Sequence, residues 1–382
     1  MPPPGLARVG IILGELGEVK RETLVVWGQV ALLGLVLYVF LVSIGLLGAS
    51  FKLFGKDFAQ QVMQTTANPL VGLFAGILAT TLVQRSSTTT SIVVGMVAAG
   101  ALTIETAIPA IMGANIGTSV TSTLVSMGHI TRKVEFKRAL AGATVHDFFN
   151  LMAVVVLLPL EIAYGYLRWI ATAASEAFVG FGGMKLSSPL KAIVKPAVGF
   201  LKGALDENAI LCLVVAIILM YLSLKFLVDL AKGIVVQRSG RFLNRYLFGA
   251  PMVAMAFGVV MPVLVQSSSI TTSLLIPLIG AGILTLEQVF PFTLGANIGT
   301  TVTAMLASLA TGNPAAVTVA FAHLFFNLTG IGIVYPLAPI RRIPLRLARG
   351  LAELTSRSRA YALVYVGFVF FALPLTLIYF WR

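Results

Sequence analysis

Long apolar runs, separated by short polar segments, dominate the pattern of this chain. Five of these runs are predominantly apolar over about 20 residues or more, which is the length a helix needs to cross a bilayer. They lie at residues 23–48, 140–159, 209–230, 315–335 and 361–380. The pattern therefore predicts five uninterrupted membrane-spanning helices.

Two further apolar stretches are interrupted by a block of amide and hydroxyl residues. The blocks read QRSSTTTS at 84–91 and QSSSITTS at 266–273. The apolar arm on each side holds only about 15 residues, which is short for a full crossing. We therefore expect two re-entrant helical hairpins, at 68–102 and 251–282, with polar tips buried inside the protein.

Each expected hairpin is followed by an apolar run with a second polar break. These breaks read GANIGTS at 113–119 and GANIGTT at 295–301. Glycines and hydroxyl residues at membrane depth are typical of discontinuous helices that line a binding site. We expect such broken helices at 104–127 and 285–309.

The sequence contains an internal repeat. Gln84 and Gln266 are 182 positions apart, and so are Asn115 and Asn297. Each half contributes three crossings and one hairpin, and an odd number of crossings inverts the second copy. We expect an all-α polytopic membrane protein with two inverted-topology repeats and one extra C-terminal span. The expected boundaries are 1–160 for the first repeat, 161–208 for an inter-repeat loop, 209–335 for the second repeat, and 336–382 for a basic segment and the extra span.

Composition supports lipid as the solvent. Hydrophobic residues make up 58% of the 382 positions and charged residues only 11%, with a mean hydropathy of +0.97. The net charge of +13 fits basic cytoplasmic loops, and no interleaved basic and aromatic groove indicates nucleic acid. Seventeen Lys and Arg fall on one side of the expected topology and eight on the other. This bias predicts a multi-pass protein of the cell (inner) membrane with a cytoplasmic amino terminus, which lacks a signal peptide.

The doubled motifs carry a resemblance. The paired Gln-Ser blocks, the paired GANIGT breaks and the segment HDFFN at 146–150 resemble the type II sodium-dependent phosphate cotransporter family over residues 68–335. The segment 161–208 lacks cysteine, so the chain is similar to a compact prokaryotic member. The resemblance implies a symporter whose hairpin tips and unwound helices meet near mid-membrane, with phosphate between the tips and sodium nearby.

The chemistry of these residue types agrees with that implication. Hydroxyl and amide groups and half-helix amino termini suit an anion, while hydroxyl, amide and carbonyl oxygens suit sodium without adding negative charge. Expected substrate-binding residues are Gln84, Arg85, Ser86, Ser87, Gln266, Ser267, Ser268, Ser269, Asn115 and Asn297. Expected sodium ligands are Gln84, Ser86, Thr118, Ser119, Thr121, Gln266, Ser268, Thr300, Thr301 and Thr303.

Other readings of the same residues stay open. A serine hydrolase would need one privileged Ser beside a base such as His146, but the duplicated blocks offer no unique nucleophile, so we expect no enzyme and no organic cofactor. A channel also uses re-entrant polar loops. Transport of another small oxyanion, a changed coupling ion and a homo-oligomer are further alternatives.

Several single residues have two interpretations each. His146 and His323 are each followed four positions later by an Asn, so each pair shares a helix face and favours a hydrogen bond between helices over a place in the ion path. Asp147 either tunes cation coupling or pairs with a neighbouring helix. Glu105 and Glu287 are expected to complement helix dipoles in first turns.

Arg85 departs from the family pattern. It stands where the family, and the second copy of this chain at Ser267, have serine. Its guanidinium either contacts phosphate directly or replaces one sodium ion. The structural alternative is that it reaches water or pairs with an acid such as Asp147.

Overall fold

A computed structural model describes residues 28, 31–55, 57, 60–61, 64, 67–236 and 248–381. The expected cytoplasmic amino terminus and most of the basic loop before Phe248 lie outside these residues. The described chain is built from helices, which confirms the all-α polytopic class. Seven of its helices are long and apolar enough to cross a membrane: Ala31–Leu53, Ile104–Met127, Lys133–Tyr164, Ala209–Phe226, Leu286–Thr311, Pro314–Val334 and Ala360–Trp381.

Both expected hairpins are helical. The first consists of α3 (Pro69–Val83) and α4 (Ser86–Ala99), and the second of α11 (Pro251–Val265), α12 (Ser268–Ser273) and α13 (Ile276–Gly280). Each turn is made by a glutamine in the left-handed region, Gln84 at φ 57° and Gln266 at φ 54°. Non-glycine residues adopt this region rarely, and such strain gathers at functional sites.

The returning arm of the second hairpin is split where the first is continuous. Pro277 stands in the first turn of α13, and proline has no backbone N–H with which to continue a helix from the preceding turn. The returning arm of the first hairpin has no proline, so α4 runs without a break.

Only one of the two expected broken helices is broken. The first divides into α5 (Ile104–Gly117) and α6 (Val120–Met127), whereas α14 (Leu286–Thr311) is continuous, so the expected break at 295–301 is wrong. In α14 the Thr300 and Thr301 hydroxyls bond to the carbonyls of Ala296 and Ile298, at 2.9 and 2.7 Å, and Thr118 and Ser119 make the equivalent bonds in the first copy, so these bonds do not explain the difference. In the first copy the Thr118 carbonyl accepts a hydrogen bond from the Ser269 hydroxyl of the other half.

Glycines set how each hairpin packs on the helix that follows it. A Cβ at Gly113 would lie 1.9 Å from the Leu73 carbonyl oxygen, and one at Gly295 would lie 2.0 Å from the Met255 carbonyl oxygen. Leu73 and Met255 are themselves 182 positions apart, so both contacts keep the register of the repeat. Helix α3 therefore packs on α5 as α11 packs on α14, at a distance that only small residues allow.

The segment 161–208, expected as a loop, is mostly helical. Helix α7 (Lys133–Tyr164) is followed by α8 (Tyr166–Gly180) and α9 (Gly183–Ala204). The Glu161 carboxylate accepts hydrogen bonds from the backbone N–H groups of Leu167 and Arg168, at 2.6 and 3.2 Å, and so satisfies the free donors at the start of α8. Neither α8 nor α9 is among the candidate spans.

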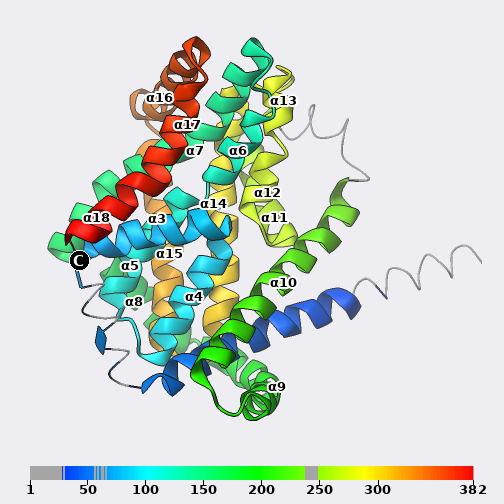
Figure 1. Ribbon diagram of the computed structural model, residues 1–382, viewed down its shortest axis with the longest axis vertical. Coiled ribbons are helices and arrows are strands. Elements are labelled where there is room, and N and C mark those ends of the chain that lie inside the picture. Colours follow the sequence, from blue (N-terminus) through cyan, green and yellow to red (C-terminus); the bar gives the residue numbers. More distant parts are fainter. Residues whose placement is uncertain are drawn as a thin grey trace, which may run out of the picture.

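The remaining helices are α10 (Ala209–Val236), α15 (Pro314–Val334), α16 (Ala338–Arg357), α17 (Ala360–Gly367) and α18 (Leu373–Trp381). A π-helical turn, Phe368–Ala372, joins α17 to α18 just before Pro374, where the proline removes one regular helix bond. Figure 1 shows α16, α6 and α13 at one end of the bundle and α9 at the other.

Candidate functional site

The two hairpin tips face one another across a narrow polar gap, called the tip cavity below, which is too closed in this structure to hold a water molecule. The helices of the hairpins bring the tips together, so that residues 182 positions apart share one lining. The lining consists of Arg85, Ser86, Ser87, Leu224, Gln266, Ser267, Ser268 and Ser269. All five serines are buried. Seven of the ten residues expected to bind substrate therefore line one cavity.

Arg85 enters this cavity from an extended backbone, at φ −148°. Its Cζ lies 5.3 Å from the centre of the Tyr221 ring on α10, a cation–π arrangement. Leu224, one turn further along α10, lines the cavity itself. The sequence offered no sign of these two residues, because both stand in an unbroken apolar run.

Asp147 has a partner from the extra C-terminal span. The Tyr365 hydroxyl donates to Asp147 Oδ2 at 2.8 Å, and Asp147 is buried. This contact is the pairing with a neighbouring helix that was one of the two expected roles. The partner lies 218 positions away, so no local pattern indicates it.

Each tip glutamine accepts a hydrogen bond from a threonine that lies after the hairpin, in α6 or in α14. The Thr303 hydroxyl donates to Gln266 Oε1 at 2.9 Å, and the Thr121 hydroxyl donates to the Gln84 carbonyl at 3.4 Å. Both pairs are 37 positions apart, but the acceptor is the backbone carbonyl in Gln84 and the side-chain amide in Gln266. Four of the expected sodium ligands are thus gathered in two oxygen-rich pairs.

Four other expected sodium ligands bond to their own helices. The hydroxyls of Thr118 and Ser119 donate to the carbonyls of Ala114 and Ile116, as those of Thr300 and Thr301 do in α14. Donation leaves the hydroxyl lone pairs as acceptors. Ser122 joins this region from α6, with its hydroxyl 3.1 Å from that of Thr272 on α12.

Asn115 and Asn297 lie in a buried network rather than in the cavity lining. Asn297 Oδ1 is 2.5 Å from His146 Nε2, and Asn115 Oδ1 is 3.4 Å from His323 Nε2, so each histidine contacts the asparagine of the other half. Asn150 joins the two sides, accepting from Asn297 Nδ2 at 2.8 Å and donating to the Asn115 carbonyl at 2.7 Å. The expected hydrogen bonds between helices are confirmed for both histidines.

The two first-turn acids also have partners. Glu105 follows the cap Thr103 at the start of α5 and bonds Arg168 at 2.7 Å, while Glu287 follows the cap Thr285 at the start of α14 and bonds Arg349. Both acids take the helix-start position that the sequence predicted.

Fold and site together define a polytopic helical membrane protein with two hairpin tips around one polar cavity. The Na+/Pi-cotransporter family profile matches residues 39–189 and 218–376, and the chain belongs to this family. No solved structure matches the chain.

Two animal relatives illustrate the similarity. Sodium-dependent phosphate transport protein 2B of Homo sapiens is 36% identical over 447 aligned residues, covering 91% of this chain and 64% of the human protein. Sodium-dependent phosphate transport protein 2A of Rattus norvegicus is 36% identical over 417 residues, covering 88% of this chain and 65% of the rat protein. The chain thus spans a little under two thirds of the length of these relatives.

Proposed function

We propose that this protein is a sodium-coupled symporter of inorganic phosphate. The observation that carries the proposal is the cavity between the tips, where Arg85 and five buried serines converge. Family membership and the printed names of the relatives support the same substrate and coupling ion. The residues present a cation and many hydroxyl donors without a carboxylate in the lining, which suits an oxyanion.

In this proposal the tips, which are closed against each other here, move apart to admit phosphate between them. Arg85 offers planar donors to two phosphate oxygens, and its contact with Tyr221 orients the guanidinium. The serine hydroxyls and the free N–H groups at the start of α4 complete the cradle. Sodium is held at the Gln84–Thr121 and Gln266–Thr303 pairs, with Ser86, Ser268 and the hydroxyls of Thr118, Ser119, Thr300 and Thr301 as nearby oxygen donors.

We further propose that the halves are inverted repeats that work by alternating access. The matching glycine contacts, the matching Gln–Thr links and the crossed His–Asn contacts support a shared plan for the two halves. Symmetric halves around a central site allow that site to open to one side and then the other. The first half is proposed to end near residue 160 and the second to run from 209 to 335.

The proposed orientation places the basic end of the bundle in the cytoplasm. The start of α7 and the whole of α16 carry basic residues and lie at the same end (Figure 1). An excess of Lys and Arg marks the cytoplasmic side of membrane proteins. Residues 1–27, whose expected position is also cytoplasmic, lie outside the described residues.

Uptake of radiolabelled phosphate into proteoliposomes tests the proposal. We expect accumulation above the external concentration when an inward sodium gradient is present, and none when potassium replaces sodium. Uptake that only equilibrates would indicate a channel, and equal uptake in potassium would overturn sodium coupling. Competition by arsenate and sulfate then separates phosphate from other oxyanions.

A further inference from the structure

A much larger cavity lies at the end of the bundle where α7 and α14 begin. Its volume is about 1010 Å³, and its walls come from the start of α7, the end of α13, the start of α14 and one face of α16. None of its lining residues belongs to the tip cavity. It is therefore separate from the proposed phosphate site.

The lining carries more positive than negative charge. Its charged residues are Lys133, Lys137, Arg138, Arg349, Glu287 and Glu353. Both acids are already paired, Glu353 with Lys137 and Glu287 with Arg349. Lys133 and Arg138 have no ion-pair partner in the part of the chain that the structure describes. Two cations are thus left to receive an anion.

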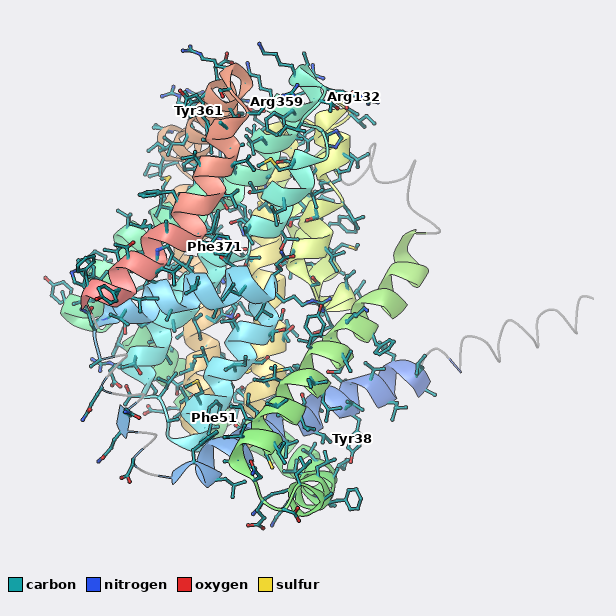
Figure 2. All side chains as sticks on the ribbon, in the orientation of Figure 1. Tyr38, Phe51, Arg132, Arg359, Tyr361 and Phe371 are labelled. Atoms are coloured by element: carbon teal, nitrogen blue, oxygen red, sulfur yellow. The ribbon has the colours of Figure 1, made fainter. Side chains whose placement is uncertain are left out.

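The surroundings add further positive charge. The pKa of the Glu353 carboxyl is lowered by a hydrogen bond from Lys137 and by the charges of Lys137, Arg357 and Lys133. A smaller adjoining cavity shares Lys133 and Ser356 with the first and adds Arg357 and Arg359. Figure 2 shows Arg359 at this end of the bundle, beside Tyr361.

The position of the cavity corresponds to a membrane surface. Candidate spans begin at Lys133 and Leu286, which both line it, and Tyr361 near the start of the C-terminal span is 46% exposed, as interfacial aromatic residues are. Val134 in the lining is 64% exposed, so apolar surface adjoins the cations. Helix α16 is amphipathic and exposes Leu347 between Arg346 and the cavity residue Arg349, as helices at a lipid interface do.

We propose that this cavity binds the headgroup of an anionic phospholipid. Lys133 and Arg138 receive the phosphodiester, and Val134 and Leu286 contact the upper part of the acyl chains. The lipid then contacts α7, α16 and the end of the second hairpin at once, because Gly282 and Ile279 also line the cavity. The inference concerns lipid binding and stands apart from the transported substrate.

The test compares lipid binding by two variants of equal charge. The full-length protein in neutral detergent is titrated with phosphatidylglycerol or phosphatidylcholine, and retained lipid is counted by native mass spectrometry while the thermal midpoint is followed. The site variant is Lys133→Gln/Arg138→Gln. The control is Arg342→Gln/Arg346→Gln, which removes two exposed cations of α16 that line neither cavity.

We expect the site variant to bind phosphatidylglycerol roughly 25-fold more weakly, about fivefold for each cation removed, and the control to change less than about twofold. Phosphatidylcholine should give no saturable shift in the wild type. Equal losses in the two variants would show diffuse attraction to the basic surface and overturn the site. Displacement of the lipid by millimolar inorganic phosphate would show a site for free anions instead, and unchanged transport in the site variant would leave the lipid result intact.

Discussion

The two hairpin tips share a backbone and differ in chemistry. Both turn at a left-handed glutamine, and both glutamines are linked to a threonine 37 positions further on. After the glutamine comes Ser267 in the second tip, whose hydroxyl accepts a hydrogen bond from the Ile270 N–H and caps α12. Arg85 stands at this position in the first tip and makes no side-chain cap for α4. The first tip gives up a helix cap, worth about 1 kcal/mol, to place a cation in the cavity.

This difference separates scaffold from substrate chemistry. The features that both tips share, the turn and its link to the next helix, belong to the duplicated scaffold. The single charge belongs to one copy only, so it breaks the symmetry of the cavity between them.

Replacing the contact glycine should destabilise the protein equally in both halves. Gly113→Ala and Gly295→Ala each place a methyl group against a backbone carbonyl that has little freedom to move, so each should destabilise the protein by about 3 kcal/mol or more. Thermal midpoints in detergent measure the effect. Gly332→Ala, where a Cβ meets no atom within 4 Å, is the control. A severe loss in one half alone would contradict equivalent packing.

The tip glutamines should be needed for transport but not for folding. Gln266→Ala removes the acceptor of Thr303, whereas Gln84→Ala removes a side-chain amide and keeps the backbone carbonyl that Thr121 contacts. Gln84 is exposed and Gln266 partly exposed, so the folded state should survive. We expect phosphate uptake in proteoliposomes to fall at least about tenfold, the loss of ~1.4 kcal/mol of binding. Gln266→Ala with normal sodium-driven uptake would remove this residue from the site.

Replacing Asn297 should destabilise the protein more than replacing Asn115. Asn297 uses both its amide oxygen and nitrogen in close side-chain bonds, whereas Asn115 has only a 3.4 Å contact with His323 and a bond to its own helix. Asn297→Ala removes the partner of His146 Nε2 and of Asn150 Oδ1 and should cost about 1–3 kcal/mol, more than Asn115→Ala. Unfolding in detergent compares the two. An equal cost would mean that the network is energetically symmetric.

Replacing Arg85 by serine makes the first tip resemble the second. Arg85→Ser should restore a cap and raise stability by about 1 kcal/mol while weakening phosphate binding about tenfold. If the charge replaces a sodium ion, the steepness of sodium activation rises instead. Concentration dependence of uptake distinguishes these outcomes. Wild-type phosphate affinity together with wild-type steepness of sodium activation would leave only a structural role for Arg85. A second variant, Tyr221→Leu, tests whether the ring contact positions the guanidinium.

The smallest effect concerns the Gln–Thr links. Thr303→Val removes a hydroxyl that bonds Gln266 at 2.9 Å, whereas Thr121→Val removes a longer contact of 3.4 Å. Both should raise the sodium concentration for half-maximal uptake by a few-fold, about 1 kcal/mol, with the larger shift in Thr303→Val. Phosphate affinity at saturating sodium is the internal control. Unchanged sodium dependence in both variants would exclude these residues as ligands.

The sequence predicted much of the architecture because its main signals are local or repeated. Apolar run length indicated the helices, the polar blocks indicated hairpin tips at Gln84 and Gln266, and the register of 182 positions paired the two tips. Spacing on one helix face also indicated helix-to-helix bonds for His146 and His323. These features need no knowledge of distant neighbours.

Other expectations failed where local composition permits two structures. The glycines and threonines of 295–301 allow a break but do not force one, and α14 remains continuous although the equivalent residues of the first copy, with the same hydroxyl bonds, separate α5 from α6. The segment 161–208 lacks a long apolar run, yet it forms helices once Glu161 supplies an acceptor at the start of α8.

The sequence alone determined which polar groups enter the apolar interior, since a buried amide or hydroxyl must find a partner. Only the tertiary structure decided which partner each one finds. Tyr221 beside Arg85, Tyr365 on Asp147 and Asn297 on His146 all come from segments more than 100 positions away. Hydrogen bonds and ring contacts act over a few ångströms, so they depend on how helices pack and leave no trace in the local pattern.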